Sequence, residues 1–328
     1  MPSKKQKNKI QSAVLVASLF AFAALFLFSL VALNMINQQS LDNRSDASSF
    51  EMVEEKSPVG SCGSLTGDAQ RACERAALMA LYNSTGGPNW RNKQGWDTSA
   101  DYCTWHGIRC HNNQLYWIDL TNNNLTGILP PDLGNLNQLE NLNLMYNSLT
   151  GAIPREIGNM TNLQVLSLNH NTLSGTIPPE LASLSRLTDL TLNHNNLSGS
   201  IPIQLGQLAN LHRLVLDNNQ LTGSIPDSIG QLTQITRIVI NSNRLTGPIP
   251  STFTNLVALQ SFIFNTQQSG PNAICVANPS VRTFLTTVEN LNPNGDDVQP
   301  GPSIQEGLPD CANSFTTSRK TPTPPKKR

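Results

Sequence analysis

Two histidines and one aspartate are spaced so that a regular repeat would bring them together. The numbers of His170 and His194 differ by 24, and those of His194 and Asp217 differ by 23. Two imidazoles and a carboxylate can bind zinc, and an imidazole can also act as a general base. No third metal ligand has a matching spacing, so we expect neither a metal site, a cofactor nor a catalytic residue. We assign these three side chains to a ligand-binding surface instead.

Two arginines follow the same interval. The numbers of Arg213 and Arg237 also differ by 24, as do those of Asp189 and Arg213. Two guanidinium groups on one face suit a carboxylate or a phosphate, which they bind through paired hydrogen bonds. An ion pair between Arg213 and Asp189 is the alternative interpretation.

A third group of residues is apolar and lies near the start of the regular region. Trp117, Met145 and Tyr146 belong to residue types that are over-represented at the centres of binding interfaces. They therefore predict an apolar anchor for a ligand. Packing against an N-terminal cap explains them equally well.

These intervals come from an internal repeat that occupies positions 115–258 and restarts at every 24th position. Six whole copies and a decayed seventh begin at Leu115, Leu139, Leu163, Leu187, Leu211, Ile235 and Leu259. In the copy LQVLSLNHN, apolar and polar residues alternate, which predicts a short strand with one buried face. Asn171 ends this string, and a column of such asparagines can bond the backbone of neighbouring coils. Gly175 and Pro178 then bend the chain away from the strand.

One coil cannot bury its leucines alone, so the coils must stack, with parallel strands about 4.8 Å apart. The third, fifth, seventh and eighth places of each copy point outward and form columns across the strands. The third column is Trp117, Asn141, Val165, Asp189, Arg213, Arg237 and Ser261. The seventh is Thr121, Met145, Asn169, Asn193, Asp217, Asn241 and Asn265, and the eighth is Asn122, Tyr146, His170, His194, Asn218, Ser242 and Thr266.

The string LxxLxLxxNxLTGxIPxxLGxLxx resembles the plant-type leucine-rich repeat of receptor kinases, receptor-like proteins and polygalacturonase inhibitors. The string CTWHGIRC, which begins at Cys103, resembles the CxWxGVxC signature of that family's N-terminal cap. The resemblance implies an α/β repeat solenoid, a right-handed superhelix with a parallel concave sheet, six full repeats, a partial seventh and disulfide-bonded caps. It also implies that the concave face recognises a ligand.

The charge balance argues against nucleic acid as a partner. The chain has 22 basic and 22 acidic residues, but nine of the bases lie in the two terminal tails, which contain no acid. The remainder is acidic and would repel a phosphate backbone.

The N-terminal region predicts a membrane anchor. Residues 1–12 form a short basic cytosolic tail, and residues 13–33 are apolar throughout, a segment long enough to cross a bilayer. Since the lysines precede this segment, the positive-inside rule places the repeats outside the cytosol. Cleavage as a signal peptide, which would give a secreted protein, is the alternative. Residues 34–61 are polar and are interpreted as a stalk.

Two caps are expected to enclose the repeats, which occupy residues 115–266. The N-terminal cap covers residues 62–114 and contains a helix over about 68–82, whose first turn Asp68 can cap. Trp90, Trp96 and Trp105 are expected to cover the end of the leucine core. The C-terminal cap covers residues 267–312, and residues 313–328 form a basic, proline-rich tail.

The six cysteines fit an exported protein with three disulfides, for which 15 pairings exist. Their sequence neighbourhoods favour Cys62 with Cys73, Cys103 with Cys110, and Cys275 with Cys311. Export also agrees with five glycosylation sequons, at Asn43, Asn83, Asn124, Asn159 and Asn196.

No P-loop, GxSxG, HExxH or kinase motif is present in the sequence, so we expect no enzymatic activity. The predicted function is recognition: a membrane-anchored extracellular protein that binds a peptide, protein or glycan and acts through a co-receptor or signalling partner. The alternative is a secreted or wall-associated hydrolase inhibitor. One offshoot of the resembled family binds ordered water or ice, but we expect no flat, regular threonine array here.

Overall fold

The computed structural model describes residues 62–264, residues 274–291 and Cys311. The chain divides into two compact units, Met1–Pro58 and Val59–Arg328, and all described residues belong to the second. The apolar segment 13–33 and Asn43 lie outside the described residues. Within the described part, no helix is both long enough and apolar enough to span a bilayer.

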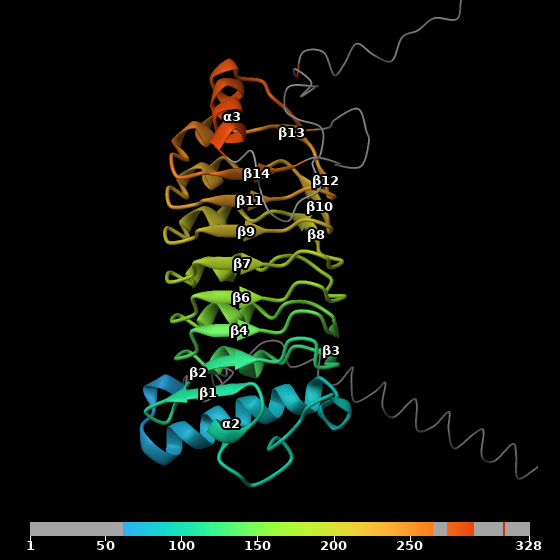
Figure 1. Ribbon diagram of the computed structural model, residues 1–328, viewed down its shortest axis with the longest axis vertical. Helices are drawn as coiled ribbons and strands as arrows, with labels where there is room; N and C mark the ends of the chain where they lie inside the picture. Colours follow the sequence, from blue (N-terminus) through green and yellow to red (C-terminus); the bar gives the residue numbers. More distant parts are fainter. Residues whose placement is uncertain (1–61, 265–273, 292–310, 312–328) are drawn as a thin grey trace, which may run out of the picture. The chain divides into compact units, whose positions relative to one another are not determined.

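An eight-stranded sheet runs along the described part of the second unit (Figure 1). Its first two strands are antiparallel, and every later strand joins in parallel. In spatial order the strands are β1 (Ile108–His111), β2 (Gln114–Asp119), β4 (Asn141–Asn143), β6 (Val165–Ser167), β7 (Asp189–Thr191), β9 (Arg213–Val215), β11 (Arg237–Val239) and β14 (Ser261–Ile263). Sequence order equals spatial order, as stacked coils require.

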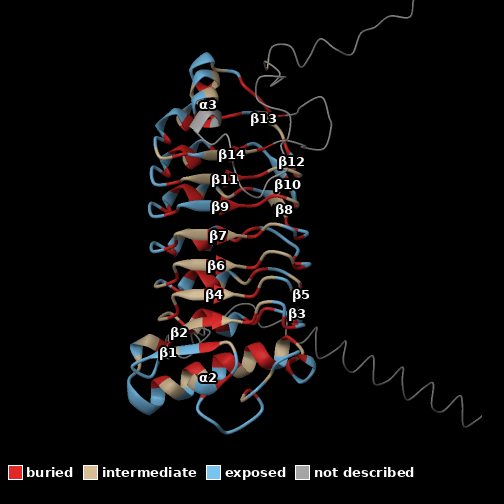
Figure 2. Ribbon diagram, viewed as in Figure 1, coloured by how far each residue is buried: buried red, intermediate tan, exposed pale blue. Residues whose placement is uncertain are grey.

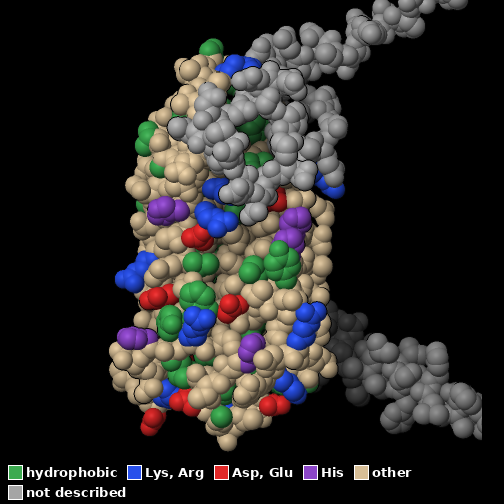
Figure 3. Space-filling model, in the orientation of Figure 1, with side chains coloured by type: hydrophobic (Ala, Val, Ile, Leu, Met, Phe, Trp, Pro, Cys, Tyr) green, Lys and Arg blue, Asp and Glu red, His purple; other side chains and the backbone are tan. Residues whose placement is uncertain are grey.

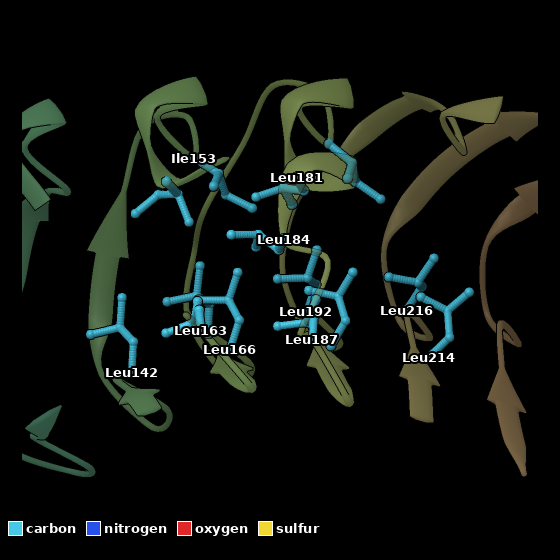
Figure 4. Close-up of a cluster of buried hydrophobic side chains, with 14 of the residues drawn as sticks. Leu142, Ile153, Leu163, Leu166, Leu181, Leu184, Leu187, Leu192, Leu214 and Leu216 are labelled. Atoms are coloured by element: carbon cyan, nitrogen blue, oxygen red, sulfur yellow. The ribbon is translucent and has the colours of Figure 1, made fainter. Parts of the chain in front are cut away.

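The leucines that the repeat places inward form one continuous core. Leu166, Leu190 and Leu214 on neighbouring strands are at most 1% exposed. Figure 4 shows inward leucines from successive coils pointing between the strands and the opposite wall. That wall is a row of short 3₁₀ helices, at Pro131–Asn135, Arg155–Asn159, Pro179–Ser183, Ile203–Gln207, Asp227–Gln231 and Ser251–Asn255. Figure 2 shows buried residues recurring from coil to coil.

The asparagine column bonds the backbone of successive coils, as predicted. The side-chain amide of Asn195 donates to the carbonyl oxygens of Leu168 and Leu192, each at 3.0 Å. Its Oδ1 accepts from the backbone N–H of Leu173 at 2.9 Å. Since Asn195 is 8% exposed, these bonds satisfy backbone groups that water does not reach.

A second set of short strands lies where the sequence predicted only a bend. In the LTG and LSG segments, β3 (Thr126–Ile128) pairs with β5 (Ser148–Thr150), and β10 (Gln220–Gly223) pairs with both β8 (Ser198–Ser200) and β12 (Arg244–Leu245). The glycines adopt positive φ angles, for example +78° at Gly175, and still allow pairing between coils. These strands were not predicted, because each is too short to show a period.

The N-terminal cap closes one end of the core. Its helix α2 (Gly67–Ser84) begins after Thr66, and Asp68 lies inside the first turn, so the prediction that Asp68 caps the helix is wrong. Trp90, Trp96 and Trp105 are at most 5% exposed and contact one another in series, with centroids 4.9 Å apart at each step. They belong to the same buried cluster as the first leucines of the repeats, as expected.

The C-terminal cap is attached through a short parallel pair, β13 (Gly247–Pro248) with β15 (Ile274–Cys275). Helix α3 (Pro279–Leu291) follows and buries Val281 and Leu285. The structure forms the three disulfides favoured by the sequence, Cys62–Cys73, Cys103–Cys110 and Cys275–Cys311.

We expect reduction of the disulfides to loosen both caps before the central coils. The central strands are held by stacking and by the asparagine column and carry no cysteine, whereas each cap closes an otherwise open end of the core. Amide hydrogen exchange after mild reduction should accelerate in α2 and β15 while β6, β7 and β9 keep their protection. Equal acceleration of the central strands would contradict this account.

Candidate functional site

The outward side of the eight-stranded sheet, here called the sheet face, carries the candidate residues. Strand register aligns the third column in one row, since Asp189 pairs with Arg213 and Arg213 pairs with Arg237. Figure 3 shows basic and acidic side chains beside one another on this face, over the more C-terminal strands.

Arg213 and Arg237 differ in their ionic partners. The Nε of Arg213 lies 3.7 Å from Oδ1 of Asp189, so this ion pair, the alternative interpretation, is present. Arg213 remains half exposed. Arg237 has no carboxylate within ion-pair distance among the described residues, and its buried Nε has no hydrogen-bond partner there. A buried donor of this kind is costly to leave unpaired, so Arg237 is a candidate anion-binding group.

The eighth column forms a stack of rings. Tyr146 stacks on His170 with ring centroids 4.2 Å apart, and His170 stacks on His194 at the same distance. Asn218 continues the column with its amide 3.3 Å from Nε2 of His194. Figure 3 shows histidine side chains directly against hydrophobic ones on this side.

The backbone of the eighth column is left-handed, with φ between +52° and +56° from Asn122 to Ser242. Asparagine tolerates this conformation, whereas tyrosine and histidine adopt it at a cost. Neither the backbone conformation nor the stacking was predicted from the sequence. The asparagines at two positions of this column, Asn122 and Asn218, were the available signal.

The geometry disfavours a metal site at the two histidines. Stacked imidazoles direct their in-plane lone pairs in parallel, not toward one point where an ion could sit. Asp217 lies 3.9 Å from Nε2 of His194, too far for a normal hydrogen bond, and its Oδ2 accepts from the Asn218 amide at 2.7 Å. No group of three metal-binding side chains occurs among the residues that the structure describes.

The stack also changes the acidity of one imidazole. Burial lowers the pKa of His170, the neighbouring His194 lowers it further, and Asp217 opposes the shift. The neutral form of His170 is therefore favoured in the folded state.

We expect two substitutions to move the pKa of His170 in opposite directions. His194→Gln removes a like charge and should raise it toward its usual value, whereas Asp217→Asn removes an attractive charge and should lower it. NMR titration of the His170 ring measures both, and His212→Gln, outside the stack, is the control. A shift of the same sign in both variants would contradict the electrostatic assignment.

The same shift predicts how stability depends on pH. Because the pKa of His170 is lowered in the folded state, the histidine binds protons more readily in the unfolded chain once the pH falls below its ordinary pKa of about 6.5. The stabilising contribution of neutral His170 is thus complete above that pH. This contribution is lost as the pH falls from the ordinary pKa through the lower pKa that His170 has in the folded state.

Trp117 follows the alternative interpretation and packs against the cap. It lies in the third column and pairs with Arg109 of β1, whose guanidinium carbon is 5.1 Å from the indole centroid. The buried Nε1 of Trp117 has no hydrogen-bond partner among the described residues. Met145 and Tyr146 belong to the next coil, so the apolar anchor is reduced to these two side chains.

Known family models match the repeats and the N-terminal cap. A leucine rich repeat family model matches residues 137–197, a second matches residues 114–136, 210–232 and 234–256, and a leucine rich repeat N-terminal domain model matches residues 72–111. The chain is a leucine-rich repeat protein. These ranges coincide with the coils and with the cap that begins the solenoid.

Similar proteins include plant receptors. The Arabidopsis thaliana receptor-like kinase TMK4 is 30% identical over 66 residues, which are 20% of this chain and 7% of that protein. The Arabidopsis receptor kinase HAESA, solved with the peptide hormone IDA and the co-receptor SERK1, is 29% identical with a TM-score of 0.57, over 64% of this chain and 36% of that chain. A plant ice-binding protein is 31% identical with a TM-score of 0.55, over 62% of this chain and 64% of that chain. The chain thus spans less than two thirds of each of these proteins.

A regular column of hydroxyls, mixed serine and threonine, follows the second set of strands. It consists of Thr126, Thr150, Ser174, Ser198, Thr222 and Thr246. Several of these hydroxyls are already engaged: Thr150 donates to the carbonyl of Gly127, and Ser198 donates to that of Gly175. Hydroxyls that already donate to the backbone are less available to order water, so this column is less suited to binding ice.

Proposed function

We propose that the leucine-rich repeats form an extracellular recognition module that binds a peptide through an anionic group on the sheet face. The supporting observation is the adjacent pair Arg213 and Arg237, of which only Arg213 has an ionic partner among the described residues. Asp189 holds Arg213 in place and can release it to a ligand carboxylate. The HAESA structure, a similar solenoid with a bound peptide hormone, supports a peptide as the ligand class.

The remaining sheet-face residues contribute shape and hydrogen bonds. Met145 and Tyr146 provide an apolar contact, while His170, His194 and Asp217 provide polar edges beside it. Trp117 packs against the N-terminal cap and is not assigned to the ligand. A separate partner must transmit the signal, since a recognition surface has no signalling activity of its own inside a cell.

The positions of the sequons support exposure of the sheet face. The four sequon asparagines that the structure describes, Asn83, Asn124, Asn159 and Asn196, are exposed and lie outside the strands of the eight-stranded sheet. Glycans at these sites would leave the sheet face uncovered. We propose that the repeats are glycosylated outside the cytosol and that residues 13–33 anchor them to the membrane.

The test is selection of binders from a random peptide library with free C-termini on the immobilised full-length chain. We expect enrichment of acidic side chains or C-terminal carboxylates, and loss of that enrichment for the Arg213→Ala, Arg237→Ala double variant. Capture of a hydrolase from extracellular extracts instead would favour the inhibitor alternative. An ice-recrystallisation assay on the same protein separates ice binding from both.

A further inference from the structure

Tyr146 ends the ring stack with one face uncovered. Its other face stacks on His170 at an interplanar angle of 12°, and His170 is the one ring that contacts it among the described residues. Tyr146 is 51% exposed, and no other tyrosine, tryptophan or phenylalanine that the structure describes is as open to solvent. No second ring contacts Tyr146 among the described residues, so its exposed surface leaves room for a further ring on the side away from His170.

The preceding position of the column does not extend the stack, because it carries Asn122. Arg91 of the cap donates to the side-chain oxygen of Asn122 at 2.7 Å and to its carbonyl oxygen at 3.2 Å. Both acceptors beside the open face are thus engaged. A sugar ring needs several convergent polar groups around an aromatic platform, and two of the acceptors nearest to this one already bind Arg91, which favours an aromatic ring over a sugar.

The tyrosine is also held rigidly. Its left-handed backbone, with φ +56°, donates to the carbonyl of Asn169 at 3.1 Å, and the ring is braced by His170. Met145 lies beside it, half buried. Little conformational entropy remains to be lost when a second ring packs on this face.

We propose that the open face of Tyr146 binds an aromatic side chain of the peptide partner, which becomes the fourth ring of the stack. The proposal rests on the proposed function in one respect: the ring that stacks on Tyr146 is taken to come from the bound peptide. Offset-stacked rings are a favoured aromatic geometry, and the ligand ring would continue a stack whose spacing is already set.

The experiment uses a small probe without a carboxylate, so that it is independent of the arginine pair. Saturation-transfer NMR measures binding of N-acetylphenylalaninamide to the full-length protein, with methyl β-glucoside as the comparison ligand. We expect the amide to bind, Tyr146→Phe to keep that binding, and Tyr146→Leu to weaken it about 2- to 10-fold, the scale of one ring pair. Tyr116→Leu, at a partly buried tyrosine outside the stack, is the matched control, and Arg237→Ala should bind the probe as wild type does.

Two results would overturn the proposal: binding of the glucoside in preference to the amide, or equal binding of the amide to wild type and Tyr146→Leu. Unchanged amide exchange in β4 and β6 verifies that each variant is folded. If the peptide library shows no arginine-dependent acidic preference but the probe result holds, the proposed function fails while this aromatic site stands.

Discussion

Asn195→Ala is expected to destabilise the solenoid by about 1–3 kcal/mol, because that is the cost of a buried polar backbone group without a partner. The substitution leaves the buried N–H of Leu173 without its side-chain partner. The carbonyls of Leu168 and Leu192 each lose one of two asparagine donors and keep the other, from Asn171 and Asn219. Urea denaturation followed by circular dichroism measures the loss.

Asn193→Ala is the matched control, because it makes the same chemical change two residues earlier. The side chain of Asn193 lies in the seventh column on the sheet face and is only partly buried. Its loss should change the free energy of unfolding by no more than about 0.5 kcal/mol. If the two variants were equally stable, the asparagine column would not hold the coils together.

Arg237→Ala is expected to weaken binding of a selected acidic peptide by about 1.5 to 3 kcal/mol, the scale of a hydrogen bond to a charged group. This corresponds to roughly 10- to 150-fold in affinity. Arg213→Ala should cost less, because Asp189 already competes for that guanidinium. Titration calorimetry at low salt measures each value.

Arg244→Ala controls for net charge. Arg244 belongs to the same repeat as Arg237, but it lies on β12 of the second set of strands and is exposed. Its removal should leave affinity nearly unchanged apart from a small effect of net charge, which salt screens. Equal binding by wild type and by the Arg213→Ala, Arg237→Ala double variant would show that the pair has no role in recognition.

The solenoid itself was predictable because inward leucines, turn glycines and the asparagine column are each fixed by local requirements that recur in every copy of the repeat. The alignment of Arg213 with Arg237 followed from the same period. What the outward side chains contact was not predictable in the same way. Trp117 contacts Arg109 of the cap, since the hairpin of β1 and β2 supplies a neighbour that lies outside the repeat.

The ring stack shows the same limit. A sequence places Tyr146, His170 and His194 in one column, but their stacking depends on a left-handed backbone that only asparagine would have indicated. The second set of strands escaped prediction because such short strands carry no measurable alternation. In both cases the decisive contacts run between coils, where sequence proximity gives no information.

The uniform register makes distances along the sheet face change in whole steps. Each coil adds about 4.8 Å, so Tyr146 and Arg237, four coils and about five residues of strand apart, are separated by roughly 25 Å. An extended peptide covers that span with about seven residues. Deletion of one complete copy of the repeat would shorten the span by a single step without altering either side chain's immediate neighbours, so ligand length becomes a quantity that the number of repeats selects.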